Sequence, residues 1–212
     1  GAMFTLMNYL DKAGISPQGL KIAVQVFGNV GSIGAKLMAE RGCKIIAVSD
    51  VGGTIYKETG IDIEKAIEYA KANNKSLKGY KEDGLKEISV KDFWALETDV
   101  IFPAALENQI NSDNAKSIKA TIIVEGANGP TTVEADKILA DKGVVILPDI
   151  LANAGGVVVS YFEWVQNLES FMWEEDYINQ NLEKIMKRAF NEGWQVKNEK
   201  AVPMRMVAYM GE

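Results

Sequence analysis

The sequence predicts an α/β fold with a doubly wound, mostly parallel sheet and a C-terminal helical tail. Up to about residue 150, short apolar runs alternate with segments of helical periodicity. Turns that contain glycine or proline separate these runs, and only helical patterns follow residue 150. Strands that alternate with helices form sheets with helices on both faces, so the first part of the chain is expected to be Rossmann-like.

Each strand and helix can be placed from its own pattern. The expected strands are 22–27, 45–49, 99–102, 121–124 and 144–147. The expected helices are 3–13, 30–41, 62–72, 113–118, 132–141, 156–170, 174–197 and 203–210. Residues 54–57 are expected to form a short hairpin-like excursion, and 73–90 a loop with short irregular pieces. Asp62 and either Thr131 or Thr132 are the expected N-caps of their helices.

The chain divides into three expected parts. Residues 1–14 form an N-terminal helix, 15–150 a dinucleotide-binding core, and 151–212 a helical segment that packs on this core. The opening Gly1-Ala2-Met3 resembles the remnant of a cleaved affinity tag, which predicts a chain cut from a longer protein.

Composition excludes several functional classes. The 212 residues are 47% hydrophobic and 25% charged, as in globular proteins, and the net charge of −6 argues against nucleic-acid binding. No apolar run approaches the ~20 residues of a membrane span, and no signal-peptide pattern is present. Histidine is absent, which removes histidine-based catalysis and the commonest zinc ligand, so no metal site is expected. Cys43, the single cysteine, fits a reducing cytoplasm.

A glycine-rich turn between the first strand and its helix predicts dinucleotide binding. Gly28 and Gly31 occupy the second and third positions of the G-x-G-x-x-G pattern, and Asp50 follows Gly28 by 22 positions, at the end of the next strand. A pyrophosphate would lie on the backbone N–H groups of residues 28–31, and Asp50 would accept from a ribose 2′-OH. The alternative is a plain strand–helix turn followed by an acidic strand end.

Val26 stands at the first glycine position of this pattern. That glycine normally makes the tight turn, whereas a β-branched residue prefers extended geometry. The turn is therefore expected either to take another course or to be strained.

Three further segments follow expected strands and are site candidates, since ligands of such sheets bind at the carboxyl ends of strands. Ala104 lies in 103–108, where small residues would leave room for an adenine. The alternative is that this segment only ends the strand. Asn128 lies in 126–130 and could bind a carboxamide or a ribose hydroxyl, although Asx-Gly turns are common. Asn153 opens the helical tail and could equally be an N-cap, as Ser160 could be an ordinary helix serine.

Six segments in this order carry a resemblance to a known family. They are Val-Phe-Gly-Asn-Val-Gly (26–31), Ala-Val-Ser-Asp (47–50), Pro-Ala-Ala (103–105), Glu-Gly-Ala-Asn-Gly-Pro-Thr-Thr (125–132), Asp-Ile-Leu-Ala-Asn-Ala-Gly-Gly-Val (149–157) and Val-Ser-Tyr-Phe-Glu-Trp-Val-Gln-Asn (159–167). Together they resemble the cofactor-binding domain of the hexameric glutamate dehydrogenases, within the Glu/Leu/Phe/Val dehydrogenase superfamily. The resemblance covers about residues 4–210.

The resemblance implies a role for each candidate residue. Gly28, Asn29, Val30 and Gly31 would form the pyrophosphate turn, Asp50 would bind the adenosine ribose, and Ala104 would line the adenine pocket. Asn128 and Asn153 would lie beside the nicotinamide and its ribose. Val157 and Ser160 would reach across the cleft, Ser160 toward the distal carboxylate of glutamate.

The resemblance also implies what this chain lacks. The family's catalytic lysines and aspartate belong to a substrate domain that no segment here resembles, so no catalytic residue is expected in this chain. The intact enzyme would interconvert L-glutamate with 2-oxoglutarate and ammonia as a homohexamer. The chain alone is expected to bind cofactor without turnover, as a monomer or weak dimer.

Asp50 favours NAD over NADP, because a 2′-phosphate would meet its carboxylate with no adjacent lysine or arginine, and Lys57 is the closest candidate cation that follows it. Two alternatives stay open. One is the cofactor domain of a leucine, phenylalanine or valine dehydrogenase, which Ser160 would distinguish. The other is a non-catalytic dinucleotide-sensing module whose tail binds a partner.

Overall fold

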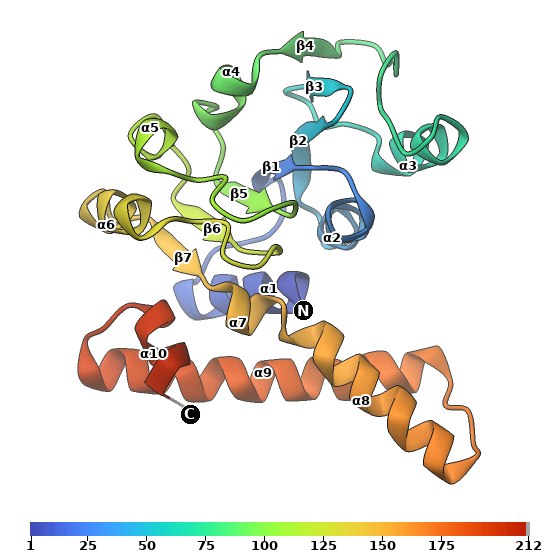
Figure 1. Cartoon of the computed structure of the whole chain (residues 1–212), viewed down its shortest axis with the longest axis vertical. Coiled ribbons are helices and arrows are strands. Elements are labelled where there is room, and N and C mark those ends of the chain that lie inside the picture. The colour runs from blue at the N-terminus through green and yellow to red at the C-terminus, as the bar shows by residue number, and fades with distance from the viewer. Residues whose placement is uncertain (211–212) are drawn as a thin grey trace.

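A seven-stranded sheet with helices on both faces forms the centre of the molecule in a computed structural model that describes residues 1–210 (Figure 1). The strand order is β4-β3-β2-β1-β5-β6-β7. The strands are β1 (Lys21–Gln25), β2 (Lys44–Asp50), β3 (Gly53–Tyr56), β4 (Lys86–Ile88), β5 (Val100–Pro103), β6 (Ile122–Val124) and β7 (Val145–Leu147). This architecture confirms the predicted doubly wound, mostly parallel α/β fold.

Two antiparallel strands extend one edge of the sheet beyond the five predicted strands. The segment predicted as a hairpin-like excursion is β3, which pairs antiparallel with β2, and β4 then pairs antiparallel with β3. The prediction of a loop over 73–90 was therefore wrong at its end. β4 is only three residues long and largely exposed, so its residues show no apolar alternation from which a strand could be recognised.

The helices follow the predicted order. They are α1 (Ala2–Ala13), α2 (Asn29–Glu40), α3 (Ile63–Ala72), α4 (Val90–Trp94), α5 (Ser112–Ala115), α6 (Val133–Asp141), α7 (Asp149–Ala152), α8 (Ala154–Glu169), α9 (Glu175–Lys200) and α10 (Met204–Met210). The side chains of Asp62 and Thr132 accept hydrogen bonds from backbone N–H groups in the first turns of α3 and α6, which confirms both as N-caps. The short helices α4 and α7 were not predicted.

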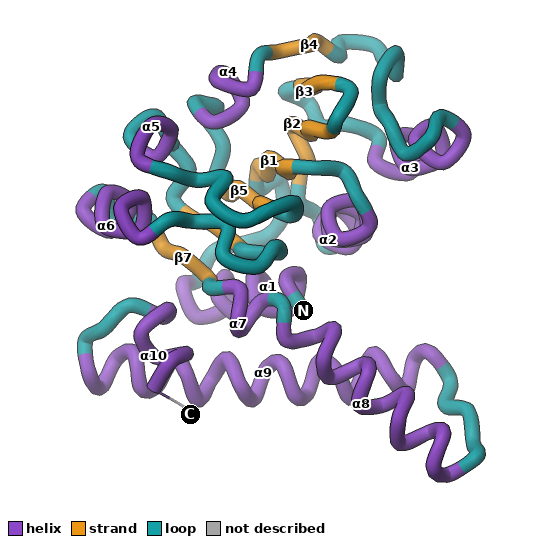
Figure 2. The backbone as a smooth tube through the Cα atoms, viewed as in Figure 1, coloured by secondary structure: helices purple, strands orange, loops and turns teal. Residues whose placement is uncertain are grey.

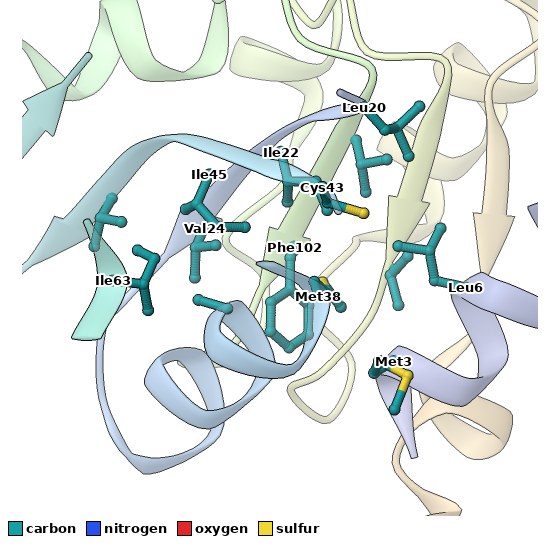
Figure 3. Packing of buried hydrophobic residues seen from close by; sticks show 14 of the residues in the cluster. Met3, Leu6, Leu20, Ile22, Val24, Met38, Cys43, Ile45, Ile63 and Phe102 are labelled. Atoms are coloured by element: carbon teal, nitrogen blue, oxygen red, sulfur yellow. The ribbon is translucent and has the colours of Figure 1, made fainter. Parts of the chain in front are cut away.

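The central strands β1, β2, β5 and β6 bury side chains on both of their faces. Ile22 and Val24 of β1 point into a cluster formed with α1, α2 and α3, whereas Ala23 between them joins the cluster under α4, α5 and α6. Figure 3 shows part of the first cluster, with Phe102 and Met38 among its labelled residues. Burial on both faces explains why these strands read as continuous apolar runs.

Phe102 at the end of β5 is enclosed by two glycines. A Cβ at Gly34 of α2 would lie 2.4 Å from its ring, and a Cβ at Gly126 would lie 2.3 Å from it. Both positions therefore need glycine. Through this contact the ring brings α2 and the segment after β6 close to the carboxyl end of β5.

The helical tail covers the β7 side of the molecule. In Figure 2 the long helix α9 passes beneath α1 and α7, and the loop between α8 and α9 extends away from the sheet. α10 returns to pack on α9 and β7 through the buried Met204 and Val207. Residues 211–212 of the expected tail lie outside the described residues. Within residues 1–210, no helix combines the length and the apolarity needed to cross a membrane.

Candidate functional site

The carboxyl ends of the parallel strands lie level at one edge of the sheet. Gln25, the last residue of β1, pairs with Ser49 of β2 on one side and with Pro103 of β5 on the other. α2 connects β1 to β2, and the chain later returns to the opposite side of β1 as β5. The end of β1 is thus the topological switch point, where ligands of such sheets bind.

The N-terminus of α2 lies at this switch point without a capping side chain. Its N-cap is Gly28, and the first turn contains no acidic residue. The first intrahelical hydrogen bond runs from the Ser32 N–H to the Gly28 carbonyl oxygen over 2.9 Å. The N–H groups of residues 29–31 precede that bond and point out of the helix end, where the helix dipole favours an anion. A Cβ at Gly28 would meet only Val26 Cγ1, at 3.9 Å, so the approach is open.

Val26 makes the tight turn in a strained conformation. Its φ is +68°, in the left-handed region that β-branched residues avoid. The Val26 N–H donates to Ser49 Oγ over 3.1 Å, which joins this turn to the end of β2. Of the two outcomes expected for valine here, the structure has the strained one.

Asp50 is anchored by backbone donors from two segments. Oδ1 accepts from the Gly52 N–H over 2.6 Å, and Oδ2 accepts from the Leu77 N–H. Each carboxylate oxygen keeps a second lone pair for a ligand hydroxyl. Lys57, the next cation after Asp50 in the chain, is in an ion pair with Glu82.

The structure brings the two candidate asparagines together. Asn153 Nδ2 donates to Asn128 Oδ1 over 2.6 Å, although 25 positions separate them. Asn153 is the N-cap residue of α8 by position, but its side chain makes no capping hydrogen bond. The two exposed amides therefore join the segments that follow β6 and β7.

A pocket of about 560 Å³ lies between Asn153 and the start of α2. Asn29, Val30 and Asn153 line it, together with Phe102 and Gly156. Asp50 lies outside this pocket, at the end of β2.

Ala104, Val157 and Ser160 complete the set of predicted residues. Ala104 is half-buried at the end of β5, where its N–H donates to the Gln25 carbonyl oxygen over 3.0 Å. Val157 and Ser160 are both exposed on α8, within two turns of Asn153. The structure thus places every predicted residue at the strand ends or on the helix that leaves them.

Sequence reasoning missed an ion-pair network behind the asparagines. Glu125 is fully buried at the end of β6, and its carboxylate binds the guanidinium of Arg205 from α10. Burial lowers the pKa of Arg205, but the hydrogen bonds and charges of Glu125 and Asp136 outweigh burial and raise it above its ordinary value. Eighty positions separate Arg205 from Glu125, so no local pattern indicates the contact.

Comparison with known proteins places this architecture in one family. The model of the Glutamate/Leucine/Phenylalanine/Valine dehydrogenase family matches residues 1–212. The glutamate dehydrogenase of Thermotoga maritima is 48% identical over 95% of this chain and 48% of its own length. The NAD-specific glutamate dehydrogenase of Clostridioides difficile is 44% identical, and the NADP-specific one of Synechocystis 43%, each over 99% of this chain and 50% of its own length.

A solved structure agrees with this placement. The hetero-hexameric glutamate dehydrogenase of Thermus thermophilus superposes with a TM-score of 0.90 at 28% identity, over 98% of this chain and 48% of that one. The chain spans about half the length of the curated relatives it matches. From its whole-length match and these relatives, the chain belongs to the Glutamate/Leucine/Phenylalanine/Valine dehydrogenase family.

Proposed function

We propose that this chain is the cofactor-binding half of a glutamate dehydrogenase and that it binds NAD in preference to NADP. The observation that carries the proposal is the uncapped N-terminus of α2 at the switch point of the sheet, with the Asp50 carboxylate at the neighbouring strand end. In this proposal, residues 15–150 form the dinucleotide-binding core and 151–212 the helical segment that packs on it.

The dinucleotide crosses the sheet edge over β1. Its pyrophosphate accepts hydrogen bonds from the N–H groups of Asn29, Val30 and Gly31, which Gly28 leaves accessible. The adenosine ribose binds Asp50 on the β2 side, and the adenine lies against Ala104. The nicotinamide end then lies toward β6, beside Asn128 and Asn153. The pocket shared by the start of α2 and Asn153 supports this course.

The preference for NAD rests on how Asp50 is held. Two backbone N–H groups anchor its carboxylate, so it cannot turn away from a 2′-phosphate without breaking both hydrogen bonds. Lys57, already paired with Glu82, is not free to neutralise that phosphate. An NAD-specific and an NADP-specific relative are similar to this chain to nearly the same degree, so the comparison does not distinguish the two cofactors. The proposed preference for NAD therefore depends on Asp50.

In this proposal the whole enzyme interconverts L-glutamate plus water with 2-oxoglutarate plus ammonia, and NAD, when bound, would supply the acceptor for the hydride. Within this chain, Val157 and Ser160 face the substrate, with Ser160 toward the distal carboxylate. The proton-transfer groups belong to the half of the relatives that this chain does not span. The chain alone therefore binds cofactor without turnover, as a monomer or weak dimer, whereas the whole enzyme is a homohexamer.

Titration of the chain with NADH, followed by nicotinamide fluorescence, tests the proposal. Gly28→Ala is the informative variant. Its Cβ meets no atom closer than 3.9 Å, so the fold should persist, while the methyl group occupies the approach to the pyrophosphate turn. We expect saturable NADH binding by the native chain and loss of that binding in Gly28→Ala, with an unchanged melting temperature.

Gly193→Ala is the matched control. It makes the same substitution in α9, where the new Cβ would lie 3.5 Å from Met204. It should bind NADH like the native chain. Equal NADH binding by both variants would show that the ligand, if any, is held elsewhere, and clear glutamate-dependent NADH formation by the native chain would contradict the absence of turnover.

A further inference from the structure

Arg205 of α10 is enclosed by three carboxylates from other parts of the fold. Nη2 and Nη1 bind the two carboxylate oxygens of Glu125 over 2.6 and 3.0 Å. Nε donates to Asp136 Oδ1 over 3.2 Å, and Nη1 lies 3.9 Å from Asp149 Oδ1. Bidentate pairing of this kind fixes direction as well as distance, because both groups are planar.

Two of those carboxylates continue into the segments that carry the asparagines. Glu125 Oε2 also accepts from the Asp149 N–H over 3.0 Å, and Asp149 Oδ2 accepts from the Gly129 N–H over 2.8 Å. The Asn153 N–H donates to the Asp149 carbonyl oxygen over 2.6 Å. An unbroken series of hydrogen bonds therefore leads from Arg205 to the residues beside Asn128 and to Asn153 itself.

The network is shielded from water at its centre. Glu125 is fully buried, and the Arg205 side chain is only 19% exposed. A buried carboxylate without its partner is strongly unfavourable, so Glu125 needs the guanidinium wherever α10 is docked.

We propose that Arg205 is a positioning residue for the nicotinamide end of the dinucleotide site. It holds the segments after β6 and β7 in register with each other, so that the side-chain amides of Asn128 and Asn153 stay paired and aimed at one ligand. This inference rests on the proposed function. It implies that docking of α10 and binding of the nicotinamide riboside support each other, whereas binding of the adenosine half is independent of α10.

Titrations with NADH and with ADP separate the two halves of the site. ADP carries the adenosine and the two phosphates but no nicotinamide riboside. The informative variant is the double substitution Arg205→Met with Glu125→Gln, which removes both charges, so that the fully buried position 125 no longer holds a carboxylate without its partner. We expect its Kd for NADH to rise at least about fivefold, because this is the smallest change in affinity that one coupled site ordinarily causes at another. We expect its Kd for ADP to stay unchanged. Arg205→Lys keeps the charge and should give an intermediate Kd for NADH.

Arg188→Met is the matched control, because Arg188 is exposed and pairs with Glu192 of its own helix. It should leave both Kd values unchanged.

Four outcomes would contradict the positioning role or the proposal beneath it. If the double variant bound NADH and ADP more weakly by the same factor, Arg205 would have only a general stabilising role, and the inference would be overturned. Unchanged binding of both ligands would also overturn it. A native chain that binds ADP and NADH equally well would overturn the inference alone, whereas one that binds neither would remove the proposed function and the inference with it.

Amide hydrogen exchange gives a second measurement that needs no ligand. In the double variant, exchange should accelerate at the Gly129 and Asn153 amides and stay unchanged in β1 and β2. Uniform acceleration, or none, would contradict the positioning role.

Discussion

The carbonyl oxygen of Val26 lies only 2.0 Å from the position that a Cβ at Gly31 would occupy. The strained residue that makes the turn and the glycine in the first turn of α2 are therefore fitted to each other. This contact brings the first turn of α2 against the end of β1, and it makes both positions sensitive to substitution.

Val26→Gly should stabilise the chain. A non-glycine residue in the left-handed region costs about 1–3 kcal/mol, and the greater freedom of glycine in the unfolded chain offsets about 0.5–1 kcal/mol of that gain. The net effect should raise the melting temperature by about 2–4 °C. We also expect tighter NADH binding, because the valine methyl group beside Gly28 is removed.

Val51→Gly is the control for this change. Val51 is 93% exposed and is not among the positive-φ residues, so glycine there only adds unfolded-state freedom. We expect the Val51→Gly chain to melt below the native chain. If the Val26→Gly chain also melted below the native chain, this result would contradict the strain at Val26.

Gly31→Ala should destabilise the chain, because its Cβ would clash with a backbone atom that cannot move without distorting β1. Overpacking of this kind costs about 1–3 kcal/mol. Gly156→Ala is the matched change, since its Cβ meets no atom within 4 Å and alanine favours a helix. Thermal unfolding compares the two, and equal melting temperatures would show that the turn is more adaptable than the structure indicates.

Asp50→Asn should weaken the discrimination between NADH and NADPH. It removes the charge that repels a 2′-phosphate, and we expect the ratio of the two Kd values to fall by about tenfold, or 1.4 kcal/mol. Stability should also fall slightly, because one of the two carboxylate oxygens becomes an NH2 group, which cannot accept from the Gly52 or Leu77 N–H that it then faces. Asp141→Asn, at an exposed position of α6, should leave the ratio unchanged. An unchanged ratio in Asp50→Asn would remove Asp50 from the determinants of cofactor choice.

Glu82 should give the chain a defined acid sensitivity. It accepts hydrogen bonds from Lys57 Nζ, from the Asp62 N–H over 3.1 Å and from the Tyr80 hydroxyl over 3.1 Å. Burial raises the pKa of Glu82, but these donors outweigh burial and leave it below its ordinary value of 4.5. Because the folded pKa is the lower one, the stabilisation is complete above about pH 4.5 and is lost as the pH falls through the folded pKa.

Glu82→Gln should therefore cost about 1–3 kcal/mol at pH 7 and much less in acid. Urea unfolding at pH 7 and at pH 3.5 measures the difference. Glu87→Gln, on the exposed strand β4, should change stability little at either pH. A Glu82→Gln deficit that is equal at both pH values would contradict a stabilising role of the ionised carboxylate.

Much of the fold was predictable because its signals are local. The apolar runs of the five parallel strands reflect burial on both faces, and Asp62 and Thr132 are N-caps recognisable from their place before a helix. α4 had such a signal too, since Ser89 accepts from the Asp92 N–H, but the polar segment before it obscured the pattern. β4 had none, because Lys86 forms a strand only by pairing with Tyr56, 30 positions earlier.

In the candidate site, too, some residues have a local sequence signal, whereas the groups that hold them in place do not. The glycines, Asp50 and the asparagines each follow a strand end and could be identified one at a time. Their partners could not, because the Leu77 N–H that holds Asp50 and the Arg205 guanidinium that holds Glu125 arrive from distant parts of the chain. A sequence pattern indicates what a side chain can do, and only the fold decides which groups hold it in place.

Parallel titrations of the native chain with NADH and with NADPH test both the proposed dinucleotide site and its preference for NAD. We expect saturable binding of both nucleotides to one site, with a clearly lower Kd for NADH, since Asp50 accepts a ribose hydroxyl and repels a phosphate. A chain that unfolds cooperatively yet binds neither nucleotide, or binds NADPH more tightly, would contradict this expectation.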